Sequence, residues 1–114
     1  MADNVVYVNF NEGVKRVMNN AKLYVKLLAK FKDDTTLGDL ETALVAGDME
    51  QAQIAAHTLK GVAANLSLTE LFEQCLAMES QIKAGIADTN QLETLKTVFA
   101  ATLQEADKVI AENG

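Results

Sequence analysis

The chain contains no proline and no tryptophan, and it has only one cysteine and one histidine among its 114 residues. A single cysteine excludes an intrachain disulfide, which is compatible with a reducing compartment. The absence of proline, together with frequent Leu, Ala, Lys, Glu and Gln, favours helices throughout. Because aromatic residues make up only 5% of the chain, we expect a core built mainly from Leu, Val, Ile and Ala.

Basic residues are too few to balance the acidic ones. Ten Lys and Arg residues stand against sixteen Asp and Glu residues, which gives a formal net charge of −6. This balance disfavours nucleic acid and anionic membranes as partners and fits a partner with a basic rim better. No apolar run approaches the roughly 20 residues of a membrane span, and the stretch from Met1 to Asn4 lacks the features of a signal peptide. We therefore expect a soluble, cytoplasmic protein.

The length favours a single domain over residues 1–114. Apolar residues at helical spacing predict six helices after an extended lead from Asp3. We expect a short helix beginning near Asn9 or Asn11, then helices over about Asn20–Phe31, Thr36–Val45, Asp48–Leu66, Ser67 to the residue before Gly85, and from after Asn90 to about Glu112. The pattern indicates an all-α fold, an up-and-down four-helix bundle with additional short N-terminal helices.

Glycines and capping pairs mark several of these boundaries. We expect glycine to end the third and fifth helices, at Gly47 and Gly85. Two pairs match a capping box, in which a polar residue caps the helix and a Glu or Gln follows three positions later. These pairs are Asp48 with Gln51, and Ser67 with Glu70.

His57 is the most informative residue. Histidine has an unperturbed pKa near neutrality, so its imidazole can serve as a neutral nucleophile. On a helix, Lys60 lies about 60° to one side of His57 and Gly61 about 40° to the other. Leu59 lies about 160° away and should face the core, which turns His57 toward solvent. Three further residues lie within about 40° of the His57 line: Glu50, Gln53 and Ala64.

This face suits phosphoryl chemistry. A ring nitrogen of His57 can attack a phosphoryl group and present it again to an acceptor, while Lys60 can offset its charge. Gly61 leaves space for a second protein, although glycine in a helix costs about 1 kcal/mol relative to alanine. Taken singly, a histidine on a helix is most often a solvated polar residue, and a glycine is often a packing compromise. Helix geometry therefore permits the chemistry without establishing it.

Other candidate sites are weaker. Cys75 lies on an apolar stripe, where a cysteine is more often part of the core than a nucleophile. A metal site would need more ligands than one histidine supplies. The sequence also has no glycine-rich phosphate loop, so we expect no nucleotide or other cofactor in this chain.

The stretch His57-Thr58-Leu59-Lys60-Gly61 resembles the signature of the histidine-containing phosphotransfer (HPt) domain of two-component phosphorelays. The residues at Asn65, Leu66, Leu71, Cys75 and Glu79 stand at offsets familiar in that family. The runs from Leu23 to Phe31 and from Leu40 to Asp48 resemble its preceding helices. The chain departs from many members at Ser67, where they have glycine at a turn.

The resemblance implies a four-helix bundle in which His57 exchanges a phosphoryl group with aspartates of response-regulator receiver domains, one of them in a hybrid histidine kinase. The receiver would supply Mg²⁺. Lys60 would support the phosphoryl charge and Gly61 would permit docking. The expected docking residues are Gln53, Ala64 and Glu79. Glu79 should lie on the facing helix near the His57 helix in a supporting role; the alternative is plain packing between helices or solvation.

The leading hypothesis is a stand-alone, monomeric phosphocarrier without kinase activity of its own. The alternative is a helical adaptor that binds a receiver-like partner without phosphorylation. It predicts that His57→Gln keeps partner binding and output. A phosphohistidine phosphatase is a third class, disfavoured because no second nucleophile or metal constellation is present.

Overall fold

The computed structural model describes residues 5–113, so the beginning of the expected extended lead, Asp3 and Asn4, lies outside the described residues. Six α-helices and no strand occur in this range. They are α1 (Phe10–Arg16), α2 (Ala21–Phe31), α3 (Thr36–Val45), α4 (Met49–Asn65), α5 (Thr69–Lys83) and α6 (Thr89–Asn113). The expected all-α fold is confirmed.

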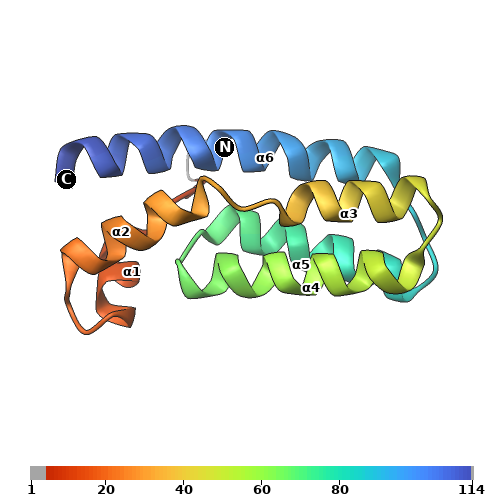
Figure 1. The fold of residues 1–114 in the computed structure, drawn as a ribbon, viewed down its shortest axis with the longest axis horizontal. Helices are drawn as coiled ribbons and strands as arrows, with labels where there is room; N and C mark the ends of the chain where they lie inside the picture. Colours follow the sequence, from red (N-terminus) through yellow and green to blue (C-terminus); the bar gives the residue numbers. More distant parts are fainter. Residues whose placement is uncertain (1–4, 114) are drawn as a thin grey trace.

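The four helices α3 to α6 form an up-and-down bundle, with α2 as a lengthwise extension. The long α6 runs along the whole molecule, and α2 and α3 follow one another along its side (Figure 1). Helix α4 packs between α3 and α5, and α6 packs against both α5 and α2. Among residues 5–113, no helix is long and apolar enough to cross a membrane.

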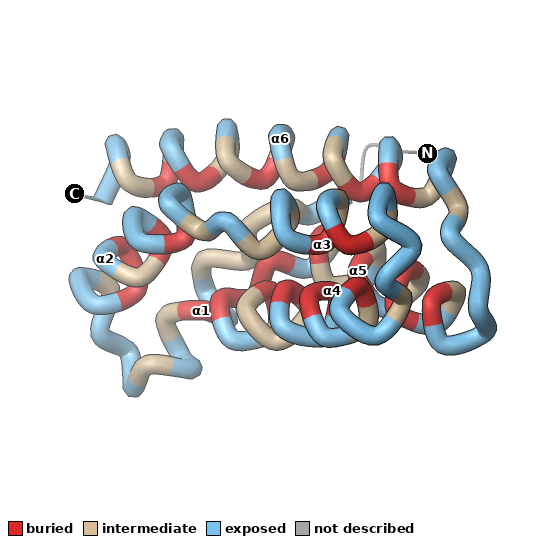
Figure 2. Tube along the Cα trace, turned by 45° about the vertical axis from the view of Figure 1, so that its right-hand side comes forward, coloured by how far each residue is buried: buried red, intermediate tan, exposed pale blue. Residues whose placement is uncertain are grey.

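One hydrophobic cluster connects helices α2 to α6. The stripe of α4 predicted to face inward is buried, with Leu59 and Ala63 fully inaccessible and Leu66 nearly so. Buried segments alternate with exposed ones along each helix of the bundle, facing its interior (Figure 2). This arrangement fixes the orientation of α4 and turns His57 outward.

Polar side chains mark the starts of several helices, and glycines mark two of the ends, largely where the sequence predicts. The side chains of Asn9, Asn20 and Asp48 each accept a hydrogen bond from an amide in the first turn of α1, α2 and α4. Gly47 and Gly85 follow α3 and α5 with φ of +72° and +80°. These left-handed conformations favour glycine, which carries no Cβ.

The predicted capping box at Ser67 is wrong. Ser67 has a φ of +57°, and α5 begins only at Thr69, after Leu68, with no side-chain cap. The Glu70 side chain accepts a hydrogen bond from Gln74 instead of returning to Ser67. Ser67 adopts the left-handed turn conformation that glycine adopts most easily, so the turn forms here without a glycine.

The chain preceding α1 is hydrogen-bonded to the α4–α5 turn. The backbone carbonyl of Val6 accepts from the amide of Glu70, and the amide of Asn9 donates to the carbonyl of Ser67, both at 3.0 Å. Backbone groups at a helix end otherwise lack partners. The first described residues therefore complete the turn that joins the two central helices.

Two side chains from α1 and α2 reinforce the same turn. Arg16 Nε donates to Ser67 Oγ at 3.1 Å, and the Tyr24 hydroxyl donates to the Leu66 carbonyl at 2.5 Å. Burial, and secondarily the charge of Glu12, raises the pKa of Tyr24 to about 12. Tyr24 therefore stays protonated as a donor across the physiological range.

Candidate functional site

His57 projects from the middle of α4 with 69% of its side chain exposed. Its Nδ1 lies 2.9 Å from Oε2 of Glu79 on α5. Its Nε2 has no hydrogen-bond partner within residues 5–113. One ring nitrogen is thus held by the protein and the other faces solvent.

Glu79 is a buried carboxylate surrounded by cationic groups. Only 4% of its side chain is exposed, and Lys60 Nζ lies 2.6 Å from its Oε1. Lys83, one turn further along α5, places Nζ 3.8 Å from Oε2. Burial raises the pKa of Glu79, but hydrogen bonds from Lys60 and His57 and the charges of Lys60 and Lys83 outweigh it and lower the pKa overall. The carboxylate is therefore ionised at neutral pH.

An ionised Glu79 decides which nitrogen of His57 carries the proton. A carboxylate can only accept hydrogen bonds, so Nδ1 must be the donor. In the neutral imidazole, Nε2 is then unprotonated and its lone pair points outward. A carboxylate that accepts a hydrogen bond from one ring nitrogen orients the histidine and fixes its tautomer. The geometry prepares Nε2 as a nucleophile.

Lys60 lies beside His57 as the helical spacing predicts, but its ammonium is paired with Glu79. About 21% of its side chain remains exposed. The pair places one positive charge next to the imidazole while satisfying the buried carboxylate. Its expected role in supporting phosphoryl charge stays a prediction.

Gly61 adjoins His57 on an open surface. A Cβ built at this position meets no atom within 4 Å. Packing between helices therefore does not require a glycine here, and the explanation of Gly61 as a packing compromise is wrong. The absence of a side chain leaves space on the outer face of α4.

A shallow hollow surrounds His57. Gln53 lines it, as expected of a residue near the His57 line, together with Ile54 from α4 and Lys83 from α5. Ile54 is 52% exposed, unusual for a large apolar side chain. Ala64 lies further along α4, beside a different hollow.

Glu79 lies on the facing helix beside His57, as expected, but the prediction that it contacts the partner is wrong. Its side chain is 4% exposed and lies beneath His57 and Lys60. A buried carboxylate cannot contact a partner protein directly, so Glu79 acts on a partner only through His57 and Lys60. Glu79 is a positioning residue.

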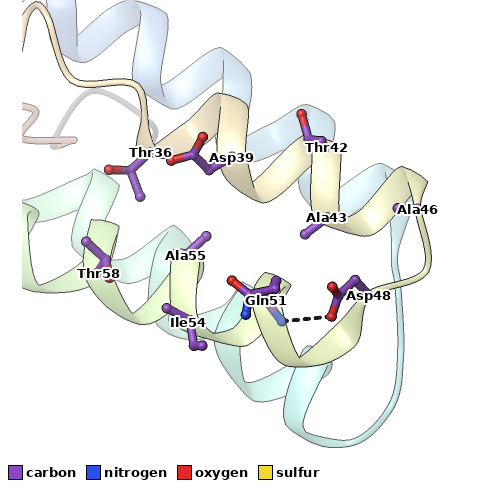
Figure 3. A pocket seen from close by; sticks show the side chains of 10 residues that line it. All are labelled: Thr36, Asp39, Thr42, Ala43, Ala46, Asp48, Gln51, Ile54, Ala55 and Thr58. Carbon is purple, nitrogen blue, oxygen red and sulfur yellow. Dashed lines mark hydrogen bonds between the residues drawn. The ribbon is translucent and has the colours of Figure 1, made fainter.

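A groove between α3 and α4 adjoins the hollow. Asp39 projects from α3 and Asp48 lies at the start of α4, while Ile54 and Thr58 line the groove from α4 (Figure 3). Ile54 and Thr58 line both the groove and the hollow. The two depressions are therefore continuous along the outer surface of α4.

Cys75 is fully buried within the core. Burial, with a smaller contribution from the charge of Glu79, raises the pKa of its thiol to about 12, although Lys60 acts in the opposite direction. A thiol with so high a pKa is a poor nucleophile at neutral pH. The expectation that Cys75 packs in the core is confirmed.

Helical spacing around His57 indicates the nucleophile, whereas Glu79 was expected near it only from the family resemblance. Glu79 stands 22 residues from His57, so only the packing of α5 on α4 brings them together. Lys83 follows Glu79 by four residues, a spacing typical of helical ion pairs that could have identified it. Ile54 lies about 60° from His57 on the helix. An apolar residue on this outward face could have identified Ile54 as part of the site.

The profile of the Hpt domain family matches residues 26–109, which span the chain from within α2 to near the end of α6. Comparisons with curated proteins and with solved structures gave no match. The matched range contains His57, Lys60, Gly61 and Glu79.

Proposed function

Because the chain belongs to the Hpt domain family, whose members are phosphocarriers of two-component systems that interact with receiver domains, we propose that His57 carries a phosphoryl group between the aspartates of two such receivers. The observation that supports this proposal is the asymmetric environment of the imidazole. Nδ1 is bonded to Glu79 and Nε2 is free and exposed.

The transfer step follows from this arrangement. The Nε2 lone pair attacks the phosphorus of an aspartyl phosphate, an N–P bond forms, and the P–O bond to the aspartate breaks to release its carboxylate. The Nδ1 proton stays in the hydrogen bond to Glu79, whose charge offsets the positive charge that develops on the ring. Transfer to the second receiver reverses these steps. The receiver supplies the Mg²⁺ that neutralises the phosphoryl oxygens.

The remaining residues have supporting roles in this proposal. Lys60 keeps a positive charge beside the phosphoryl group, and Gly61 gives the partner access. Gln53 and Ala64 contribute to the docking surface. The chain acts as a monomer without kinase activity, and a hybrid histidine kinase is one source of the donor receiver.

Incubation of the chain with a panel of receivers carrying labelled phosphate tests the proposal. We expect label on the wild-type chain that is lost in acid and is absent from His57→Gln. A Glu73→Gln variant, at an exposed position of α5 outside the hollow around His57, serves as a control and should remain labelled. If the wild-type chain binds receivers but takes no label from any of them, the adaptor hypothesis replaces this proposal.

A further inference from the structure

The net charge of −6 conceals a separation of charge along the chain. Six of the ten basic residues lie in residues 10–32 with a single acidic residue, giving this basic segment a formal charge of +5. Residues 33–113 contain four basic and fourteen acidic residues, a formal charge of −10. The basic segment comprises α1, α2 and their turn, at the opposite end of the molecule from the α3–α4 turn (Figure 1).

Most of the basic segment is unpaired and exposed. Among residues 5–113, four of its cations have no carboxylate within 4.0 Å: Lys15, Lys22, Lys26 and Lys30, all of them exposed. Lys22, Lys26 and Lys30 are spaced by about one helical turn and form a stripe about 12 Å long on α2. Like charges at this spacing repel one another. No ion pair within residues 5–113 offsets this repulsion at Lys22, Lys26 or Lys30.

The basic segment flanks the half of α4 that follows His57. On the α2 side, Lys30 lines a hollow together with Val62. On the α1 side, Arg16 lines another hollow together with Ala64. Val62 and Ala64 follow His57 by about 8 and 10 Å along the axis of α4. A protein that covers His57 and this part of α4 therefore approaches the cations of both helices.

The other half of α4 is acidic. Asp39 and Asp48 line the α3–α4 groove, and Glu50 lines the hollow around His57. His57 thus stands between an acidic and a basic region. We propose that the basic segment is an electrostatic docking surface for an acidic face of the partner protein, and that the two regions together set the partner's orientation on His57. The identity of this partner as a receiver domain rests on the proposed function.

The surroundings of the stripe favour a protein over an anionic membrane. The apolar face of α2, including Tyr24 and Leu28, is buried in the core, so the helix has no face to insert between lipids. Asp107 of α6 lies 2.5 Å from Lys32, which follows the stripe by two residues, so a carboxylate of the bundle lies at the edge of the basic segment. A flat anionic surface meets both charges, whereas a protein with an acidic patch of limited size meets the lysines alone.

The kinetic test replaces Lys22, Lys26 and Lys30 with glutamine and measures phosphoryl transfer from the receiver that labels the wild type fastest. We expect association to slow by roughly tenfold at low salt, with no change in the transfer rate at saturating receiver. The difference should shrink as salt rises, because screening shortens the range of the attraction. A Lys96→Gln variant, which removes one charge on α6, is the control and should match the wild type. Equal association rates for the triple variant and the wild type at all salt concentrations would overturn the docking surface and leave the relay intact.

A second measurement does not depend on phosphorylation. Titration with poly-L-glutamate, followed by amide chemical shifts, should perturb α1 and α2 in the wild type and not in the triple variant. Absence of these perturbations would overturn the inference. Vesicles of phosphatidylserine and phosphatidylcholine provide the remaining comparison: lysine-dependent binding to them without any response to poly-L-glutamate would replace the protein partner with a membrane. If no receiver labels His57, the proposed function fails, and the poly-L-glutamate titration decides the inference alone.

Discussion

Replacement of Glu79 by glutamine removes the negative charge that holds His57 while keeping the size of the side chain. In the wild type, Glu79 accepts from His57 Nδ1 at 2.9 Å and from Lys60 Nζ at 2.6 Å. A hydrogen bond to a charged group contributes about 1.5–3 kcal/mol, against about 0.5–1.5 kcal/mol for a neutral one. Glu79→Gln should therefore weaken the preference for the Nδ1–H form by about 1 kcal/mol. A loss of this size corresponds to a roughly five- to tenfold decrease in the rate of phosphoryl transfer.

The single histidine of the chain makes this prediction directly measurable. Nitrogen NMR of the imidazole reports one residue, so the two tautomers of His57 can be quantified without assignment of other rings. We expect the Nδ1–H form to dominate in the wild type at a pH where the ring is neutral, and to lose population in Glu79→Gln. Glu73→Gln, an exposed site on the same helix, is the matched control and should change neither the tautomer nor the rate.

The stability of the same variant should depend on pH. The pKa of Glu79 is lowered from 4.5 in the folded chain, so its contribution is fully present above pH 4.5 and is lost as the pH falls through the lower folded value. Urea unfolding should show Glu79→Gln less stable than the wild type by about 1–2 kcal/mol at pH 7, with the gap closing in acid. A gap that is equal at neutral and acidic pH, together with an unchanged tautomer, would refute the role assigned to the carboxylate.

Substitutions at three further positions, with one control position, test the backbone and the surface. Gly61→Ala and its control Gly38→Ala should each stabilise the chain by up to about 1 kcal/mol, because a Cβ meets no atom at either site. Only Gly61→Ala should slow phosphoryl transfer, because only Gly61 adjoins the nucleophile. Equal transfer rates in the two variants would show that the partner does not need this space. Gly13→Ala should cost about 1–3 kcal/mol in chemical denaturation, since its Cβ would meet the buried Tyr24 ring; wild-type stability would contradict this packing. Ser67→Gly should be more stable than Ser67→Ala by about 1 kcal/mol, the reverse of the order in a helix, because of the left-handed φ; a more stable alanine variant would be inconsistent with that conformation.

Local patterns in the sequence predict most of the fold. Apolar spacing and caps such as Asn20 and Asp48 locate the helices because these signals act within a few residues. The start of α5 is the exception. Ser67 and Glu70 match a capping box, but Ser67 is held in the turn by Arg16 and Asn9, which are distant in sequence. Contacts from another part of the chain outweigh the local preference there.

The candidate site divides in the same way. The exposure of His57 and the nearness of Lys60 follow from the geometry of one helix. The burial of Glu79 and its bond to Nδ1 depend on how α5 packs against α4, which no local pattern specifies. The positions of the charged residues that define the basic segment can be read from the sequence. The net charge alone does not reveal this separation.

Hydrogen bonds join the N-terminal part of the chain to the α4–α5 turn. The folded structure therefore includes residues that lie outside the range matched by the Hpt family. The family match begins at residue 26, yet Tyr24 and Arg16 reach partners 42 and 51 positions further along. These contacts join segments far apart in the sequence, so residues outside the matched range hold the turn between α4 and α5 in place. A domain trimmed to the matched residues would keep the imidazole and its carboxylate, and would lose the groups that fasten the far end of the helix presenting them.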